Sequence, residues 1–223
     1  MGRKFVAIVR KDLLLEVRGK DMAVSMGAFA LMVVLTFAFL VKPAGGQSSR
    51  MFPGLLWLVF LFSGMLAIGR GFEHEERDDA LAGLLAAPGG RLGIYLAKVA
   101  VAFLFMVTVE GATFPVLAAL FHEAVRASAW EIGLVFALGT LGLVGTGTLF
   151  SAMAAHTRAG PVLIPVLMLP FSVPVLLMAV EGTAAILHAG PGGGQWPWLH
   201  ALMAYDAGFL ALPLVLSEYV WEV

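Results

Sequence analysis

The chain has 223 residues, of which 60% are hydrophobic and only 13% are charged. Soluble domains are about half apolar and a quarter charged, so a water-soluble fold cannot bury this much apolar surface. The net charge of -1 says little about partners, because membrane proteins express charge through its distribution along the chain. The absence of cysteine excludes disulfides, thiolate metal sites and a thiol nucleophile.

The first 21 residues form a basic leader with helical periodicity. The apolar residues Phe5, Ile8, Val9 and Leu13 fall near one helical face, and the surrounding lysines and arginines can meet lipid headgroups. We therefore predict that residues 1–21 form an amphipathic helix in the membrane interface. A basic tail that only fixes topology is the alternative. A cleaved signal peptide is disfavoured because the charged leader is too long.

Six apolar blocks follow, each about as long as the ~20 residues that a bilayer core requires. A span must satisfy its own backbone hydrogen bonds, and the lack of alternating polarity favours helices over barrel strands. We predict an all-α, polytopic membrane protein with six transmembrane helices, forming a single domain over residues 1–223. Prolines 165, 170 and 174 are expected to kink or locally open the fifth helix. The blocks are residues 22–41, 51–69, 99–121, 132–155, 159–180 and 197–217.

The distribution of basic residues predicts the orientation. With the amino terminus in the cytoplasm, eleven basic residues lie in inner segments and three in outer segments. The positive-inside rule favours this arrangement, and six spans return the carboxyl terminus to the cytoplasm. The inner residues are Arg3, Lys4, Arg10, Lys11, Arg18, Lys20, Arg70, Arg77, Arg91, Lys98 and Arg158, and the outer ones are Lys42, Arg50 and Arg126.

The longest inner segment begins with a dense charged cluster, followed by leucines at helical spacing until Pro88. Acidic residues suit the amino terminus of a helix. We interpret residues 70–93 as a cytoplasmic coupling segment that docks on a partner and transmits a push to both adjacent spans. A solvated surface loop is the more common explanation of a charge run and remains the alternative. The candidate coupling residues are Glu73, Glu75, Glu76, Arg77, Asp78, Asp79, Leu81, Leu84 and Leu85.

Three carboxylates fall inside or near the predicted spans, where ionisable groups are costly and often functional. Glu110 is near the middle of the third block, so it must be protonated, paired or directed toward a polar cavity. Glu181 and Asp206 lie closer to the outer surface. For these two, a structural hydrogen-bonding role is as good an interpretation as substrate contact. For Glu110 we favour a functional role, and a hydrogen bond that holds neighbouring helices together is the alternative.

The sequence contains no paired constellation for acid–base or nucleophilic catalysis, so we expect a non-catalytic chain. A phosphate-binding loop is also absent, so any nucleotide hydrolysis requires another subunit. The zinc-protease pattern at His74 fails because Asp78 replaces the second histidine, and no metal site is expected. Three outer histidines could ligate a metal or heme iron, although boundary roles are more common. These are His122, His188 and His200.

The fourth block has a concentration of small residues that allows neighbouring helices to approach closely. We interpret it as a tight packing surface, and an interface that slides during transport is the alternative. The small residues are Gly139, Thr140, Gly142, Gly145, Thr146, Gly147 and Thr148. The tryptophans mostly fall near predicted span ends, as an aromatic belt would. They are Trp57, Trp130, Trp196, Trp198 and Trp221.

Several segments together resemble a known family, over nearly the whole chain. They are Lys11-Asp-Leu-Leu-Leu-Glu16, Pro53-Gly-Leu-Leu-Trp57 continuing to Phe72, the acidic segment with Leu81, Leu84 and Leu85 before Pro88, Gly139-Thr-Leu-Gly142, Thr157-Arg158 through Leu163-Ile-Pro165, Leu169-Pro170 to Pro174, and Tyr205-Asp206. Together they are similar to the heme exporter protein B (CcmB) family, the membrane subunit of the cytochrome c maturation ABC complex.

The resemblance implies an ABC-2 type exporter permease with six spans in the bacterial inner membrane. It also implies a cytoplasmic ABC ATPase (CcmA-like) that engages residues 73–85 and binds the ATP, a heme-handling membrane subunit (CcmC-like), a small membrane subunit (CcmD-like) and a heme chaperone (CcmE-like). ATP hydrolysis is then expected to drive release of the heme-loaded chaperone on the outer face. No nucleic-acid partner is expected.

The resemblance leaves open whether heme, as the transported or handled ligand, passes through this chain. It transfers no heme ligand to any residue, and we expect no other bound cofactor. Two further functions remain as alternatives. One is a secondary carrier that uses Glu110 as a proton relay, and the other is a different ABC-2 type export permease.

Overall fold

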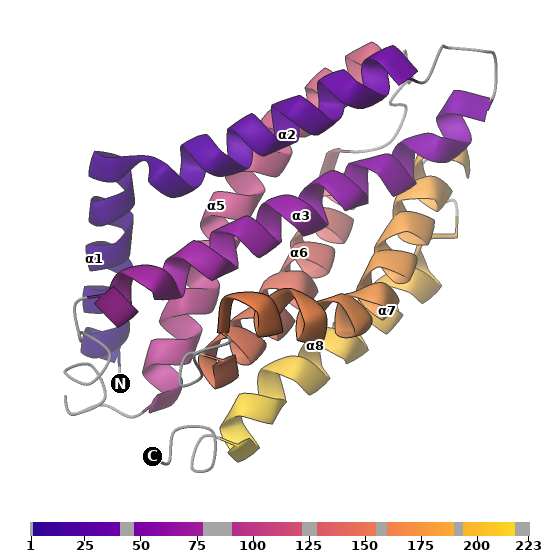
Figure 1. Ribbon diagram of the computed structural model, residues 1–223. Coiled ribbons are helices and arrows are strands. Elements are labelled where there is room, and N and C mark those ends of the chain that lie inside the picture. The colour runs from indigo at the N-terminus through magenta and orange to yellow at the C-terminus, as the bar shows by residue number, and fades with distance from the viewer. Residues whose placement is uncertain are drawn as a thin grey trace.

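The computed structural model describes residues 2–40, 47–77, 91–121, 129–154, 160–189 and 194–216. In these ranges the chain forms seven α-helices and no strand (Figure 1). The predicted all-α fold is therefore confirmed. The helices are α1 (Gly2–Gly19), α2 (Asp21–Leu40), α3 (Gln47–Arg77), α5 (Arg91–Leu120), α6 (Ala129–Ala154), α7 (Gly160–Ala189) and α8 (Trp196–Leu216).

Four of these helices contain stretches that are long and apolar enough to cross a membrane. A shorter apolar stretch, Ala23–Phe37, lies in α2. The polytopic membrane fold is thereby confirmed, whereas membrane crossing by α2 and α8 stays a prediction. The four stretches are Met51–Gly69 in α3, Leu92–Leu120 in α5, Ala129–Ala154 in α6 and Pro165–His188 in α7.

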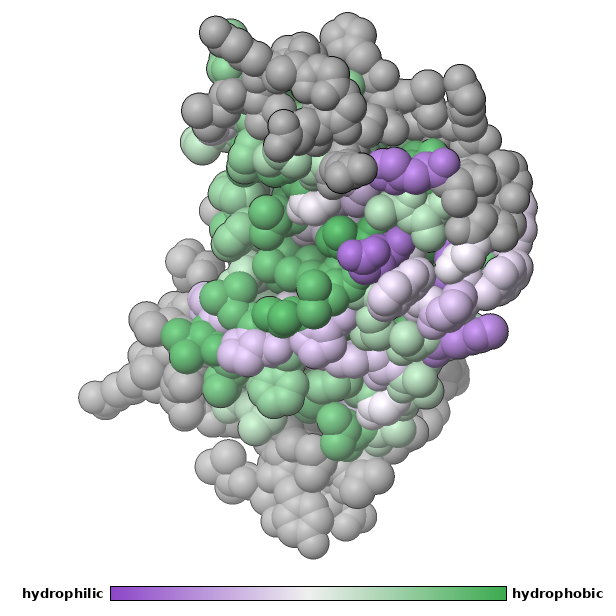
Figure 2. Space-filling view, turned by 90° about the vertical axis from the view of Figure 1, so that its right-hand side faces the viewer, coloured by the Kyte–Doolittle hydropathy of each residue, from purple (hydrophilic) through white to green (hydrophobic). Residues whose placement is uncertain are grey.

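The surface of the bundle is strongly apolar. Large side chains point outward on several helices, including Met32 and Phe39 of α2, which are 65% and 85% exposed, and Leu177 of α7, which is 61% exposed. Figure 2 shows apolar residues across the left and centre of one side of the molecule, with the hydrophilic residues to the right. An apolar surface of this extent is suited to lipid and not to water.

A single residue separates α1 from α2. Lys20 has a φ of 60°, the left-handed conformation that non-glycine residues rarely adopt, and it turns the chain between the two helices. The Glu16 carboxylate then accepts a hydrogen bond from the Ala23 backbone amide at 2.7 Å and caps the first turn of α2. As a result, α1 runs at a steep angle to α2 (Figure 1).

Helix α6 lies at the centre of the bundle, in contact with α3, α5, α7 and α8. Its residues from Gly142 to Ala152 are all buried. At Gly147, a Cβ atom would overlap Ile68 of α3 and lie 3.1 Å from Met168 of α7. The prediction that small residues of this helix allow tight packing is confirmed, and they do so on several sides of the helix.

Some boundaries differ from those expected from hydropathy. Helix α3 continues without a break to Arg77, so its acidic residues end a long helix and do not begin a separate one. Helix α5 begins at Arg91 and therefore contains Lys98, which we had placed in an inner loop. Helix α7 includes all three prolines and changes direction along its length (Figure 1). A proline removes one backbone hydrogen bond and crowds the preceding turn, which accounts for this bend.

Candidate functional site

Glu110 of α5 is buried in the contact between α5 and α6, with only 1% of its surface exposed. The hydroxyl group of Thr140, on α6, donates a hydrogen bond to the Glu110 Oε1 atom. The second carboxylate oxygen, Oε2, has no hydrogen-bond partner in the described part of the chain. The pairing gives Glu110 a defined position against α6, while its Oε2 atom is left available to accept a further hydrogen bond.

Asp206 of α8 is buried on another side of α6, with 4% of its surface exposed. A Cβ atom on Gly142 would lie only 2.8 Å from Asp206 Oδ1, so the carboxylate rests directly on the α6 backbone. Neither Asp206 oxygen has a hydrogen-bond partner among the described residues. The adjacent Tyr205 hydroxyl donates to the Phe171 carbonyl oxygen of α7 at 2.6 Å and fixes α8 against α7.

These two carboxylates lie at a similar depth along the bundle. Glu110 precedes the carboxyl-terminal end of α5 by ten residues, and Asp206 follows the start of α8 by ten residues, which corresponds to about 15 Å of helix in each case. Their neighbours on α6, Thr140 and Gly142, are two residues apart and therefore face different sides of that helix. The central helix thus separates two buried acidic groups that have unused hydrogen-bonding capacity.

The third predicted intramembrane carboxylate is placed differently. Glu181 lies on the exposed face of α7 and is not part of the buried acidic pair. A Cβ on the next residue, Gly182, would lie 3.4 Å from Trp198 Cβ, which places this part of α7 beside the start of α8. The three candidate carboxylates therefore do not converge on one site.

The outer histidines are only partly described. His188 is exposed on the last turn of α7, where its Nδ1 atom lies 2.8 Å from the Ala184 carbonyl oxygen of the same helix. His200 is exposed on α8, with its ring 6.4 Å from that of Trp196, and His122 lies outside the described residues. No group of three or more potential metal ligands occurs in the ranges that the structure describes.

The candidate coupling residues fall at the boundary of the described chain. Glu73, Glu75, Glu76 and Arg77 belong to the last turns of α3. The next helix, α5, starts at Arg91, so the predicted coupling segment connects the carboxyl-terminal end of α3 to the start of α5. The remaining candidates, Asp78, Asp79, Leu81, Leu84 and Leu85, lie outside the described residues.

Sequence reasoning missed a polar contact at the end of the bundle where α6 and α8 begin. The Gln195 side chain, just before α8, donates to Glu131 Oε1 in the first turn of α6 at 2.7 Å, and both residues are buried. Next to this contact, the exposed rings of Trp130 and Trp196 lie 6.2 Å apart. Glu131 stands at the edge of an apolar block, and an acid at a helix start was the signal that could have identified it.

Comparison with known proteins decides the family. The sequence model described as CcmB protein matches residues 3–217. The chain belongs to the CcmB family. Within the curated CcmB-family relatives, heme exporter protein B of Paracoccus denitrificans is 31% identical over 92% of this chain and 93% of that protein.

Two further relatives give the same result. Heme exporter protein B of Haemophilus influenzae is 29% identical over 89% of this chain and 90% of its own length. Heme exporter protein B of Escherichia coli K12 is 28% identical over 80% of this chain and 81% of its own length. The similarity to the CcmB family therefore covers the membrane bundle and not a short motif, and the resemblance inferred from the sequence is confirmed.

Proposed function

We propose that this CcmB-family chain is the membrane permease subunit of a complex for heme export in cytochrome c maturation. The observation that carries the proposal is the match to proteins named heme exporter protein B over nearly the full length of both chains. The fold supports it, because four helices of the described part have the length and apolarity of membrane spans. The chain itself is non-catalytic, and a separate cytoplasmic ABC ATPase subunit supplies the energy.

The coupling route runs through the inner ends of α3 and α5. Helix α3 is continuous over 31 residues, or about 47 Å, so a displacement of its inner end acts on the whole rod. Glu73, Glu75 and Glu76 lie on this inner end, and the segment up to residue 90 connects it to α5. An ATPase that engages residues 73–85 therefore moves two rods that both contact the central helix α6.

The same proposal defines location and partners. The chain resides in the bacterial inner membrane with both termini in the cytoplasm, as the excess of inner basic residues favours. Its partners are the ABC ATPase, a heme-handling membrane subunit, a small membrane subunit and a heme chaperone. Heme is the handled ligand, and ATP is bound by the ATPase subunit.

Genetic complementation tests this function. We expect the chain to restore holo-cytochrome c, measured by heme staining, in a bacterium that lacks its own heme exporter protein B. The double variant Glu75→Gln/Glu76→Gln should lose most of this activity because it weakens the ATPase contact. Glu181→Gln removes a carboxylate on the exposed face of α7 and should retain activity. Failure of the native chain to restore holo-cytochrome c, despite its presence in the membrane, contradicts the proposal.

Ion-coupled transport is a second candidate function, favoured by the two buried carboxylates beside α6. A carboxylate with unused oxygen atoms, such as Glu110 or Asp206, can accept and release a proton during transport. In liposomes, substrate flux driven by a pH gradient without nucleotide supports this function. Flux that requires ATP and the ATPase subunit supports the permease function.

A further inference from the structure

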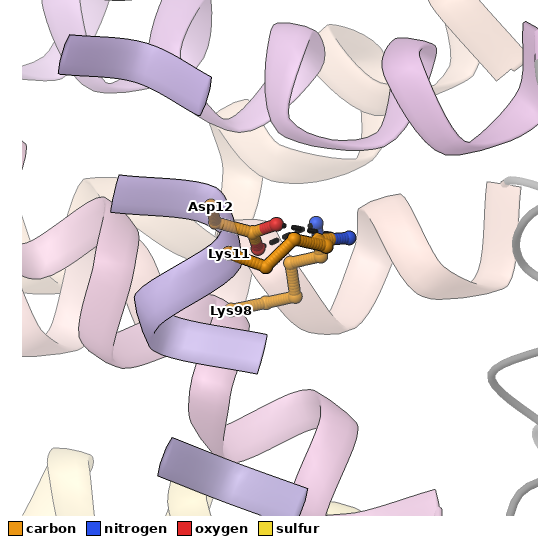
Figure 3. A network of polar contacts seen from close by, with 3 residues as sticks. All are labelled: Lys11, Asp12 and Lys98. Carbon is orange, nitrogen blue, oxygen red and sulfur yellow. Dashed lines mark ion pairs between the residues drawn. The ribbon is translucent and has the colours of Figure 1, made fainter. Parts of the chain in front are cut away.

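A buried ion pair joins the first helix to the inner part of α5. The Lys98 Nζ atom lies 3.0 Å from Asp12 Oδ2, and the two side chains are only 7% and 10% exposed (Figure 3). Lys11 Nζ lies 3.0 Å from the other carboxylate oxygen, but its side chain is 41% exposed. A buried pair restricts geometry far more than an exposed one, because removal of one partner leaves a charge in a poorly solvated place.

Apolar packing reinforces the same contact. Ile8 of α1 is 3% exposed and packs with Ile94 and Ala97 of α5, which are 1% and 0% exposed. Phe5 and Val9 flank this group, which forms a hydrophobic cluster distinct from the main core. The face of α1 that we had assigned to the membrane interface therefore lies against α5.

The connection from α1 to α2 involves far fewer residues than the contact between α1 and α5. It consists of Lys20 in its left-handed conformation, whose amide donates to the Glu16 carbonyl oxygen and whose carbonyl oxygen accepts from the Val24 amide, and of the Glu16 carboxylate that caps α2. A single residue between two helices is a place where small changes in φ and ψ redirect the following helix. Helix α1 thus packs along α5 and touches α2 only near the turn that joins them.

The ion pair also lies close to the coupling segment. Lys98 follows the start of α5 by seven residues, about 10 Å along the helix axis. Helix α5 starts directly after residue 90, where the coupling segment ends. Any displacement of the inner end of α5 therefore acts on the ion pair within about two helical turns.

We propose that α1 and the inner part of α5 move as one body, with Asp12 and Lys98 as positioning residues that carry movement of α5 to α1 and through residue 20 to α2. The proposal rests on the ATPase-driven permease function given above. It adds the amino-terminal helix to the elements that follow α5, beside α2, which itself packs against α3 and α5. Lys11 shares the carboxylate but, as an exposed residue, contributes little to this connection.

A covalent tie tests whether the two helices move together. The chain has no cysteine, so Ile8→Cys and Ala97→Cys introduce the only two thiols. Oxidation in native membranes should join them, with equal yield in the presence of ATP plus vanadate and without nucleotide. The joined protein should retain export activity, because the tie links parts of one body. A yield that changes severalfold with nucleotide, or activity lost on oxidation and regained on reduction, overturns the proposal.

Charge variants test the role of the ion pair on the same cysteine background. Asp12→Asn removes the carboxylate beside buried Lys98, and most of the disulfide yield and export activity should be lost. The neutral pair Asp12→Asn/Lys98→Met should recover disulfide yield, since no buried charge is left without its partner. Lys11→Met is the matched control and should behave like the native chain. Native yield and activity in Asp12→Asn contradict the proposal.

The two readouts separate this inference from the proposed function. Disulfide yield reports on the α1–α5 contact even when the chain exports nothing. Loss of export in every variant, the native chain included, contradicts the permease function. If Asp12→Asn does not reach the membrane, the exchange variant Asp12→Lys/Lys98→Asp takes its place. A disulfide yield like that of the native charges in this variant supports the role of the ion pair, and a yield well below it contradicts that role.

Discussion

The indole ring of Trp57 lies directly against Gly139, so closely that a Cβ atom at residue 139 would overlap the ring carbons. The same indole donates its Nε1 hydrogen to Thr183 Oγ1 at 2.9 Å. Trp57 is fully buried, and its contacts join α3 to α6 and α7. This position requires glycine for close approach of a rigid ring and not for backbone flexibility.

Substitution at this contact should destabilise the bundle. Gly139→Ala forces the Trp57 ring to move, and overpacking of this kind costs about 1–3 kcal/mol. Gly133→Ala, on the same helix, is the matched control because a Cβ there meets nothing within 4 Å. Thermal unfolding of the detergent-purified proteins measures both. A Gly139→Ala protein as stable as the control shows that the ring is not tightly held.

The hydroxyl group of Thr140 should contribute to stability through Glu110. Thr140→Val preserves the shape of the side chain but leaves both buried Glu110 oxygens without a donor in the described part of the chain. Loss of a hydrogen bond to a buried polar group costs about 1–3 kcal/mol. Thr108→Val removes an exposed hydroxyl bonded to its own helix and should change thermal stability little. Equal effects of the two substitutions contradict this role.

We expect buried Asp206 to lower the stability of the helix bundle while it contributes to transport. A buried carboxyl group without hydrogen-bond partners is unfavourable, so Asp206→Asn should raise the melting temperature by removing the charge. If the buried carboxyl group acts in transport, restoration of holo-cytochrome c should fall in the same variant. Glu181→Gln, on the exposed face of α7, should leave both quantities unchanged. A lower melting temperature for Asp206→Asn indicates that the carboxylate stabilises the bundle.

The orientation can be measured by cysteine labelling, because the native chain has no thiol. A membrane-impermeant maleimide should label Ala129→Cys, an exposed position at the start of α6, when only the outer membrane is permeabilised. Glu76→Cys, near the inner end of α3, should react only after the inner membrane is opened. The reverse pattern places the acidic segment outside, where a cytoplasmic ATPase cannot engage it.

Four of the six predicted spans agree with long apolar helices of the structure, because length and hydropathy are properties of the sequence itself. The predicted block 51–69 coincides with the stretch Met51–Gly69 in the structure. The glycines and threonines between residues 139 and 148 likewise predicted that α6 packs closely on its neighbours, since only small side chains allow helix backbones to approach. These features depend on composition over many residues and not on which helices are neighbours.

The pairings of polar residues could not be predicted, because they depend on how helices are placed around α6. Lys98 is the last residue of the predicted inner segment before the third block, yet it lies within α5, where Asp12, 86 residues earlier in the chain, pairs with it. Trp57 was grouped with an aromatic belt, but it is buried, whereas Trp130 and Trp196 are exposed as a belt requires. Whether a polar or aromatic residue faces lipid or protein depends on the neighbouring helices.

Affinity purification of the tagged chain from native bacterial membranes, followed by an ATPase assay of the eluate, tests the central claim most directly. The account predicts that a nucleotide-hydrolysing subunit co-purifies with the native chain and is lost from the Glu75→Gln/Glu76→Gln variant. A native chain that elutes alone and without ATPase activity, while still restoring holo-cytochrome c, would contradict the account.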